Sequence, residues 1–233
     1  MLREAADAGL VDERTYRRLS RVRVQVVASN HTGNWLDQKQ AQSLLDAPDR
    51  STLLGQRDHA ILATMLYTGL RRVELVSLAV SHIQEREGYW MILDLVGKRG
   101  RVRSIKLSRA VKKLIDKWLE ASGRDVEPKS FVFVPLGRAQ QPVERQMTPQ
   151  SVFNLVKKYG KAIGQPDLAP HDLRRSHAKL AHRGGVDLAQ LSKSLGHASL
   201  STTERYLGVD LDLAEQPCDF IKLKLNGRAN GSK

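Results

Sequence analysis

Near its C-terminal end the chain reads Leu195-Gly-His-Ala-Ser-Leu-Ser-Thr-Thr-Glu-Arg-Tyr206. A histidine directly follows the glycine, and a tyrosine stands nine positions after that histidine. Two further motifs lie upstream, His171-Asp-Leu-Arg174 and Thr68-Gly-Leu-Arg71. Arginine donates two parallel hydrogen bonds to a phosphate and stays charged at any accessible pH. The sequence therefore supplies two arginines, two histidines and one tyrosine that can serve a single phosphate group.

The charge of the chain agrees with a phosphate-bearing partner. There are 38 Lys and Arg against 25 Asp and Glu, which gives a formal net charge of +13 and a pI of about 10.1. An excess of this size is typical of a surface that binds a polyanion, and nucleic acid is the expected partner. The alternatives are a basic protein that is merely soluble and one that binds anionic membranes. No Lys-rich amphipathic helix with a Trp or Phe face supports the membrane alternative.

Length and composition limit the organisation of the chain. A sequence of 233 residues with 41% hydrophobic residues suits one large or two small domains with a substantial core. Cys218 is the single cysteine, so an intramolecular disulfide is excluded and the cytosol is the natural compartment. The longest apolar run, residues 60–66, is too short to span a membrane, and the N-terminus lacks an apolar signal stretch. We therefore expect a cytoplasmic protein, and with nucleic acid as its partner we expect it to be nucleoid-associated.

Periodicity and capping residues predict most of the helices. Asp37 caps a helix that contains Ala41, Leu44 and Leu45 and stops at residues 47–49. Residues 57–68 are apolar almost all round, which predicts a buried helix at the centre of the domain, ended by Gly69. A further helix begins near Arg72 and turns its apolar residues, Val73, Leu75, Val76 and Leu78, toward the core.

The stretch from residue 82 to residue 107 has a different period. Residues 89–96 and 101–107 are predicted to be antiparallel strands joined by residues 97–100, with Ile105 and Leu107 on one face of the second strand. A short strand is predicted at 131–134, and helices at 108–121, from the cap Thr148 onward, and at 171–183, 188–195 and 201–207. The predicted fold class is mainly α with a small antiparallel β-sheet (α+β).

Taken together, the motifs resemble the active site of a tyrosine recombinase of the phage integrase family. The resemblance covers roughly residues 34–207, with five motifs in the right order. It implies a tyrosine recombinase catalytic-domain fold. It also implies a DNA strand transferase that needs no cofactor, metal or ATP and that cleaves and rejoins DNA through a 3′-phosphotyrosyl intermediate. It further implies that Tyr206 is the nucleophile, while Arg71, Arg174, His171 and His197 hold the developing charge of the phosphate.

Each of these residues also has an ordinary interpretation. An arginine near a glycine at a helix end, such as Arg71, is commonly just solvated, and Arg72 is an equal candidate when seen alone. Arg71 has a carboxylate three residues later, Glu74, that can orient it. His171 and Arg174 lie on one face of a helix, where an imidazole can take the tyrosine proton or simply cap the helix.

Lys98 and Tyr206 complete the predicted site. Lys98, at the predicted hairpin tip, matches the lysine that protonates the leaving 5′-oxygen in the family, although Arg99 and Lys106 replace a glycine and a proline of the family pattern. Basic hairpin tips also serve solubility. The other tyrosines have structural interpretations: Tyr67 in the core, Tyr89 in a strand, Tyr16 in the N-terminal segment of residues 1–33 and Tyr159 in a helix. His177 stands where the family has an apolar aromatic residue, which is expected to affect packing and not chemistry.

The expected domains are residues 1–33, a remnant of or linker from a helical core-binding domain, residues 34–216, the catalytic domain, and residues 217–233, a tail with a strand at 220–225. Recombination implies a homotetramer on two double-stranded DNA sites, with a monomer in free solution also compatible. The alternatives are a type IB topoisomerase, which would relax supercoils without a defined site, a DNA-binding module with a vestigial active site, and, least favoured, a helical-repeat or RNA-binding protein.

Overall fold

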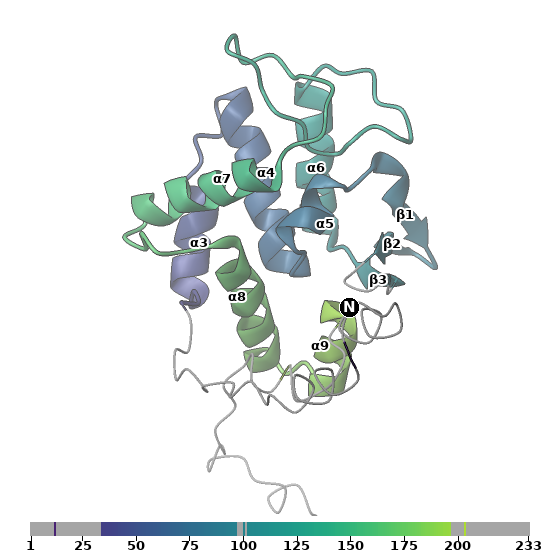
Figure 1. Ribbon diagram of the computed structural model, residues 1–233, viewed down its shortest axis with the longest axis vertical. Coiled ribbons are helices and arrows are strands. Elements are labelled where there is room, and N and C mark those ends of the chain that lie inside the picture. Colours follow the sequence, from purple (N-terminus) through teal and green to yellow (C-terminus); the bar gives the residue numbers. More distant parts are fainter. Residues whose placement is uncertain (1–11, 13–33, 97–99, 101, 197–202, 204–233) are drawn as a thin grey trace, which may run out of the picture. The chain divides into compact units, whose positions relative to one another are not determined.

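A computed structural model describes residues 12, 34–96, 100, 102–196 and 203. The chain divides into two compact units, residues 1–32 and 33–233, and the elements described below belong to the second unit. They are, in order, α3 (Gln38–Asp46), α4 (Leu53–Thr68), α5 (Arg72–Val76), the 3-10 helix η1 (Val80–His82), β1 (Ile83–Arg86), β2 (Tyr89–Val96), β3 (Val102–Lys106), α6 (Arg109–Ala121), α7 (Pro149–Ala162), α8 (Pro170–Arg183) and α9 (Leu188–Leu195). The fold is thus mainly helical with a small antiparallel sheet, as predicted (Figure 1).

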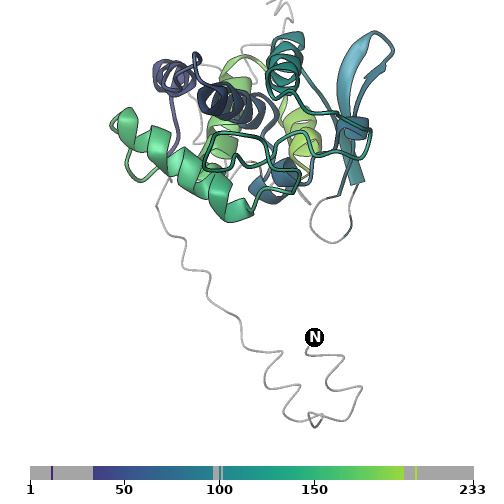
Figure 2. The same cartoon turned by 90° about the horizontal axis from the view of Figure 1, so that it is seen from above.

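Helix α4 forms the centre of this unit. It contacts α3, α6 and α8 (Figures 1 and 2). From Arg57 to Thr68 every residue of the helix except Tyr67 is buried. The helix begins four residues earlier than predicted because Thr52 accepts a hydrogen bond from the backbone N–H of Gly55 and caps the first turn. It ends where predicted, because Gly69 takes the left-handed conformation with φ 62° and donates its N–H to the Met65 carbonyl.

Within the described part of the chain the sheet has three strands in the order β1-β2-β3, all antiparallel. The pairing places Ile92 of β2 opposite Ile83 on one side and Ile105 on the other. Ile92, Ile105 and the following Leu107 are buried, so the predicted alternation of the last strand is confirmed. Strand β1 was missed, because its four residues are too few to establish a period and their exposure does not alternate.

The predicted strand at 131–134 is wrong. These residues are largely buried, but their pairing is limited to an isolated bridge between Phe131 and Ala79. Side chains bind the backbone carbonyls instead: Trp118 Nε1 donates to Val132 O at 2.8 Å, and Arg57 Nη1 donates to Val134 O at 3.3 Å. A buried apolar run needs partners for its backbone, and here side chains supply partners that a neighbouring strand was expected to supply.

Two predicted core residues are at the surface. Tyr67 is 54% exposed and Val73 is 59% exposed, although both lie in the predicted helices. Helix α5 has only five residues, so it buries Leu75 and Val76 and leaves its opposite side to solvent. The other predicted helices, from Ser108, Thr148, Pro170 and Asp187 onward, are present and begin within a residue or two of the predicted starts.

Several predictions fall on residues beyond those described. Thr203 is helical and fully buried, but the remainder of the predicted helix 201–207 lies outside the described residues, as do Tyr16, Cys218, residues 1–11 and 13–33, and the predicted strand 220–225. Among the helices that are described, none has the length and apolar character that crossing a membrane requires.

We predict that Gly69→Ala destabilises the fold more than the same change at Gly88. Both glycines have a positive φ, 62° and 78°, so alanine is strained at either position by about 1–2 kcal/mol. A Cβ at Gly69 would lie 2.8 Å from Cδ2 of His177, whereas nothing lies within 4 Å of one at Gly88. Overpacking should therefore add about 1–3 kcal/mol to the Gly69→Ala loss. Urea unfolding of the two variants measures this, and equal losses would contradict it.

Candidate active site

An open cavity of about 390 Å³ lies where the α4–α5 junction meets the α7–α8 junction. Arg71, His171 and Arg174 all line it, although a hundred residues separate the first from the other two. The cavity is completed by Leu70, Arg72, Val73, Phe153, Ala169 and Pro170. The structure therefore brings three of the predicted site residues to one common space.

Arg71 occupies the N-cap position of α5 and is held there by Glu74. Its backbone N–H donates to Glu74 Oε2 at 2.8 Å, and its Nη1 donates to Glu74 Oε1 at 2.8 Å. The Arg71 side chain is still 35% exposed. Among the described residues, no acceptor binds its Nε or Nη2, so these two donors remain available toward the cavity. The predicted role of Glu74 in orienting Arg71 thus has a geometric basis.

Glu74 also binds a second arginine, Arg103 of β3. The Arg103 Nη1 and Nη2 atoms donate to the two carboxylate oxygens at 2.8 and 2.9 Å. Glu74 is only 5% exposed, and this burial by itself raises its pKa. The hydrogen bonds from Arg103 and Arg71 and the charge of Arg103 outweigh the burial and lower the pKa to about 2. Glu74 is therefore a buried carboxylate that stays ionised between two guanidinium groups.

Arg174 is almost completely buried, with 2% exposure. Its Nη1 donates to the carbonyl of Gly69 at 2.6 Å, and its Nη2 donates to the carbonyl of Leu195. These carbonyls belong to the C-terminal ends of α4 and α9, where the helix dipoles favour a positive charge. The side chain of Arg174 is therefore fixed in one orientation beside the cavity before any ligand binds.

His171 lies in the first turn of α8, directly after Pro170, and is exposed at the rim of the cavity. The pKa of its imidazole is lowered, first because neighbouring protein removes water from part of the ring, and then by the positive charges of Arg175, Arg174 and Arg71. A lowered pKa keeps the imidazole neutral at neutral pH. His171 can therefore accept a proton at the cavity.

The described tyrosines lie away from this cavity. Tyr159 is buried, and its hydroxyl donates to Asp58 Oδ2 at 2.9 Å; burial and then the charge of Asp58 raise the pKa of the phenol. Tyr67 is exposed on α4, and Tyr89 is exposed in β2, with Lys106 Nζ 4.2 Å from its ring centre. No tyrosine in the described part of the chain lines the cavity.

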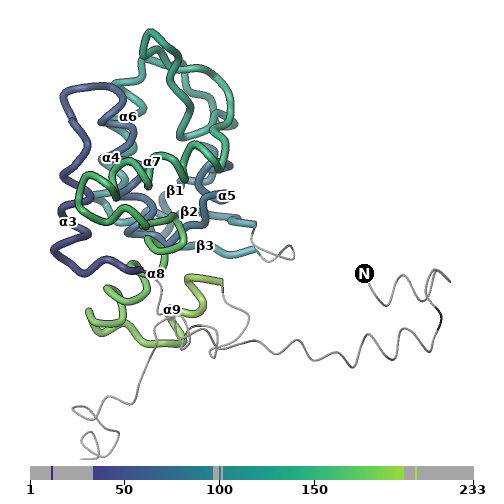
Figure 3. Tube along the Cα trace, turned by 60° about the vertical axis from the view of Figure 1, so that its left-hand side comes forward, coloured from purple at the N-terminus to yellow at the C-terminus, as the bar shows by residue number. Residues whose placement is uncertain are grey.

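Lys98, His197 and Tyr206 lie outside the described residues, so their positions relative to the cavity stay predictions. The neighbouring elements are described: β2 ends at Val96, β3 begins at Val102, and α9 ends at Leu195. Helix α9 contacts both α8 and β3 (Figure 3).

Arg103 was missed in the sequence, although a signal for it existed. It shares its strand face with Ile105, which was correctly predicted to be buried. An arginine on the buried face of a strand needs an anionic or carbonyl partner, which points to a charged cluster in the interior.

His177 has a structural role, as expected. Its Nδ1 is 2.9 Å from the carbonyl of Leu66, and its ring packs against Gly69. Burial, which is the main cause, together with the charge of Arg174 lowers its pKa. A neutral imidazole therefore packs against the C-terminal end of α4.

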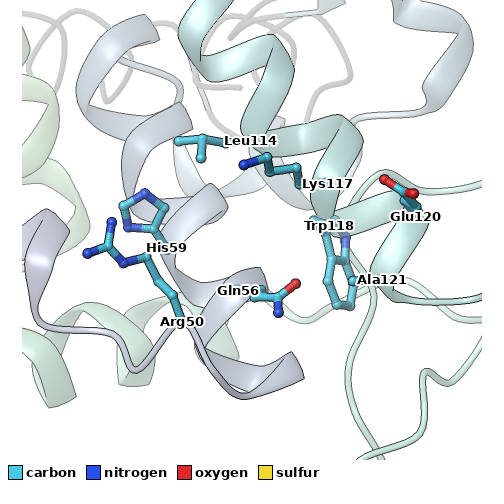
Figure 4. Close-up of a pocket in the computed structure, with 8 residues that line it drawn as sticks. All are labelled: Arg50, Gln56, His59, Leu114, Lys117, Trp118, Glu120 and Ala121. Carbon is cyan, nitrogen blue, oxygen red and sulfur yellow. The ribbon is translucent and has the colours of Figure 1, made fainter.

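A second cavity of about 510 Å³ lies between α4 and α6 (Figure 4). Its lining includes Arg50, His59 and Lys117 but none of the predicted site residues. His59 is committed to the fold, because its Nδ1 is 2.7 Å from the carbonyl of Leu45. Within the described residues, no group of three or more His, Cys, Asp or Glu side chains is placed to hold a metal ion.

Comparison with known proteins gives the family of this fold and site. Residues 34–211 match the Phage integrase family. The chain is 35% identical over 178 residues to tyrosine recombinase XerD of Xanthomonas campestris pv. campestris, covering 73% of this chain and 54% of that protein. It is 33% identical over 178 residues to tyrosine recombinase XerC of Pelobacter propionicus, covering 76% of this chain and 56% of that protein. The chain thus spans a little over half the length of these relatives.

Solved structures agree on the fold. The crystal structure of XerA recombinase superposes with a TM-score of 0.63 at 24% identity, covering 84% of this chain and 68% of that chain. A lambda integrase dimer bound to a COC′ core site gives a TM-score of 0.57 at 18% identity, covering 90% of this chain and 71% of that chain. The protein has a tyrosine recombinase catalytic-domain fold. The chain belongs to the phage integrase family.

We predict that Glu74→Gln makes the free energy of unfolding less dependent on pH between pH 4.5 and pH 2. The folded pKa of Glu74, about 2, lies below its ordinary value of 4.5, so its contribution is full above pH 4.5 and is lost as the pH falls toward 2. The variant should lose about 3 kcal/mol at pH 7, because two arginines then share an uncharged partner, and the difference should shrink in acid. Urea unfolding at several pH values measures this.

Glu144→Gln is the matched control for this prediction. Glu144 pairs with the buried Arg124 but is itself 56% exposed, so its loss should cost less than about 1 kcal/mol. Stability curves of Glu74→Gln and the unchanged protein that stay parallel from pH 7 to pH 2 would contradict the predicted role of Glu74.

Proposed function

We propose that this protein is a site-specific DNA recombinase that cleaves and rejoins DNA strands through a 3′-phosphotyrosyl intermediate. The observation that carries the proposal is the shared cavity of Arg71, His171 and Arg174. Two guanidinium groups and one neutral imidazole at one space form a suitable receptor for a phosphodiester.

The proposed reaction assigns one task to each group. Arg71 and Arg174 donate to the non-bridging oxygens, which carry increasing charge as the phenolic oxygen of Tyr206 forms its bond to phosphorus. His171 accepts the phenol proton, and the lowered pKa of its imidazole supports this assignment. His197 donates to the same phosphate.

Cleavage and rejoining are then the two directions of one exchange. The bond from phosphorus to the 5′-oxygen breaks, and Lys98 supplies the proton that makes a 5′-hydroxyl. Rejoining reverses these steps when a 5′-hydroxyl attacks the phosphotyrosyl bond. The energy of the broken diester is conserved in that bond, so the proposed reaction needs neither ATP nor a metal ion.

Double-stranded DNA is the proposed partner. The net charge of +13 suits the DNA backbone, and among the structures with the same fold XerH is bound to its difH substrate.

Residues 34–216 are proposed to be the catalytic domain. Strand exchange between two sites requires four tyrosines, so we propose a homotetramer on DNA, held together by the tail of residues 217–233. Nucleoid association follows from the same proposal.

We expect Tyr206→Phe to abolish covalent protein–DNA adducts on a nicked suicide substrate while binding is unchanged. Phenylalanine keeps the ring and removes only the attacking oxygen. Gel analysis of denatured reaction mixtures detects the adduct, and mapping of the linked peptide locates it. Tyr89→Phe is the control, because Tyr89 is an exposed strand residue, and this variant should form adducts as the unchanged protein does. Adducts that persist in Tyr206→Phe would refute the assignment.

Deletion of residues 217–233 tests the proposed assembly. The segment Ile221-Lys-Leu-Lys-Leu225 alternates apolar and charged residues, so it suits a strand added to a neighbouring protomer. The deletion should prevent formation of the four-protomer complex on two DNA sites and leave binding of one protomer to one half-site. Deletion of residues 226–233 alone should have no effect. Native-gel stoichiometry measures both, and full assembly by the longer deletion would contradict the proposal.

A further inference from the structure

The side chain of Arg103 holds together three elements that border the candidate active site. We propose that Arg103 is a positioning residue for the proposed cleavage reaction: it fixes Arg71 and the end of α9 in one arrangement. This inference rests on the proposed function and adds a residue to it. Arg103 does not line the cavity, so it acts through its partners and not on the phosphate.

The first link is to Arg71 through Glu74. Arg103 donates to both oxygens of the Glu74 carboxylate, and Arg71 Nη1 donates to Oε1, the oxygen that also accepts from Arg103 Nη1. The bidentate bond fixes the plane of the carboxylate. Because Glu74 also binds the backbone N–H of Arg71, the orientation of that plane determines where the Arg71 guanidinium lies.

The second link is to the end of α9. The Nε of Arg103 donates to the carbonyl of Ser194 at 2.9 Å, and the next carbonyl, that of Leu195, accepts from Arg174. Two guanidinium groups thus bind consecutive carbonyls of the last turn of the helix. Gly196 caps this turn with φ 64°, and a Cβ there would lie 2.9 Å from Cδ of Arg103, so the chain passes directly against the Arg103 side chain.

The elements that Arg103 links are adjacent in the chain to the other predicted site residues. Arg103 follows Lys98 by five residues along the hairpin, and the chain continues from Gly196 directly to His197 and then to Tyr206. Arg103 therefore links β3, which follows the predicted acid in the chain, to α5, which Arg71 caps, and to α9, which precedes His197 and Tyr206 in the chain.

Arginine is the side chain that this arrangement requires. Its planar fork can donate from Nη1, Nη2 and Nε in three fixed directions, and all three are used. Lysine carries the same charge as a single point and cannot bridge a carboxylate and a carbonyl in fixed geometry. The Arg103 side chain is only 9% exposed, so water cannot easily replace the missing bonds.

Two variants and one control test the inference. Arg103→Met removes the charge and the fork, and Arg103→Lys keeps the charge. Arg124→Met is the matched control, because the Arg124 side chain is also buried, also pairs with a glutamate and also donates to backbone carbonyls. Its partners are different ones: Ser122, Phe131, Val132 and Glu144. Each protein is assayed below its own unfolding temperature.

The kinetic readout is the single-turnover rate of adduct formation on the suicide substrate. We expect both Arg103 variants to be slower by about a hundredfold, the cost of displacing a catalytic group by about 1 Å, with unchanged affinity for the duplex. Arg124→Met should cleave at the unchanged rate. Wild-type rates in Arg103→Lys, or an equal loss in Arg124→Met, would overturn the positioning role.

Hydrogen exchange supplies a readout that does not depend on activity. Amides of α9 should exchange about tenfold faster in Arg103→Met, as expected for the loss of one charge-assisted hydrogen bond, and should be unchanged in Arg124→Met. Unchanged exchange in Arg103→Met would overturn the link to α9. A wild-type protein that forms no adduct would instead refute the proposed function, and the exchange data would still decide whether Arg103 holds α9.

Discussion

The buried guanidinium of Arg174 is the interaction on which the candidate active site depends. It binds the carbonyls at the ends of α4 and α9 from a position on α8, so a single charged group joins three helices. A buried cation is costly unless its donors are satisfied, and helix C-terminal carbonyls satisfy it well because their dipoles are aligned. The same contacts that make the burial tolerable orient the arginine beside the cavity. Stability and site geometry therefore arise from the same hydrogen bonds.

Burial and neighbouring charges set the protonation states of the groups around the cavity. Glu74 lies between Arg71 and Arg103 and stays ionised because their hydrogen bonds and charge outweigh its burial. His171 has the opposite surroundings: desolvation and neighbouring cations keep its imidazole neutral. A cationic cavity with a neutral base at its rim suits the proposed transfer of a phosphoryl group to a phenol. Each protonation state follows from the neighbours that folding supplies, and not from the residue alone.

Local rules predicted the elements whose signals lie within a few residues of one another. The caps Asp37, Ser108 and Thr148 and the left-handed Gly69 mark helix ends through hydrogen bonds to adjacent turns, and these ends are where they were predicted. Errors arose where a distant partner decides. The run 131–134 has the composition of a strand, but the side chains of Arg57, Trp118 and Arg124 donate hydrogen bonds to its carbonyls. Val73 and Tyr67 are apolar or aromatic, yet the described elements leave more than half of each exposed.

The sequence by itself determined the class of the fold, the family and the identity of the candidate phosphate-binding residues, because motif order, spacing and capping are local properties of a chain. The convergence of Arg71, His171 and Arg174 on one cavity was decided by tertiary structure, since it depends on how the ends of α4, α8 and α9 meet. The partnership of Glu74 with Arg103 was likewise decided there, because 29 residues separate them and only the packing of β3 against α5 and α9 brings their charges into contact.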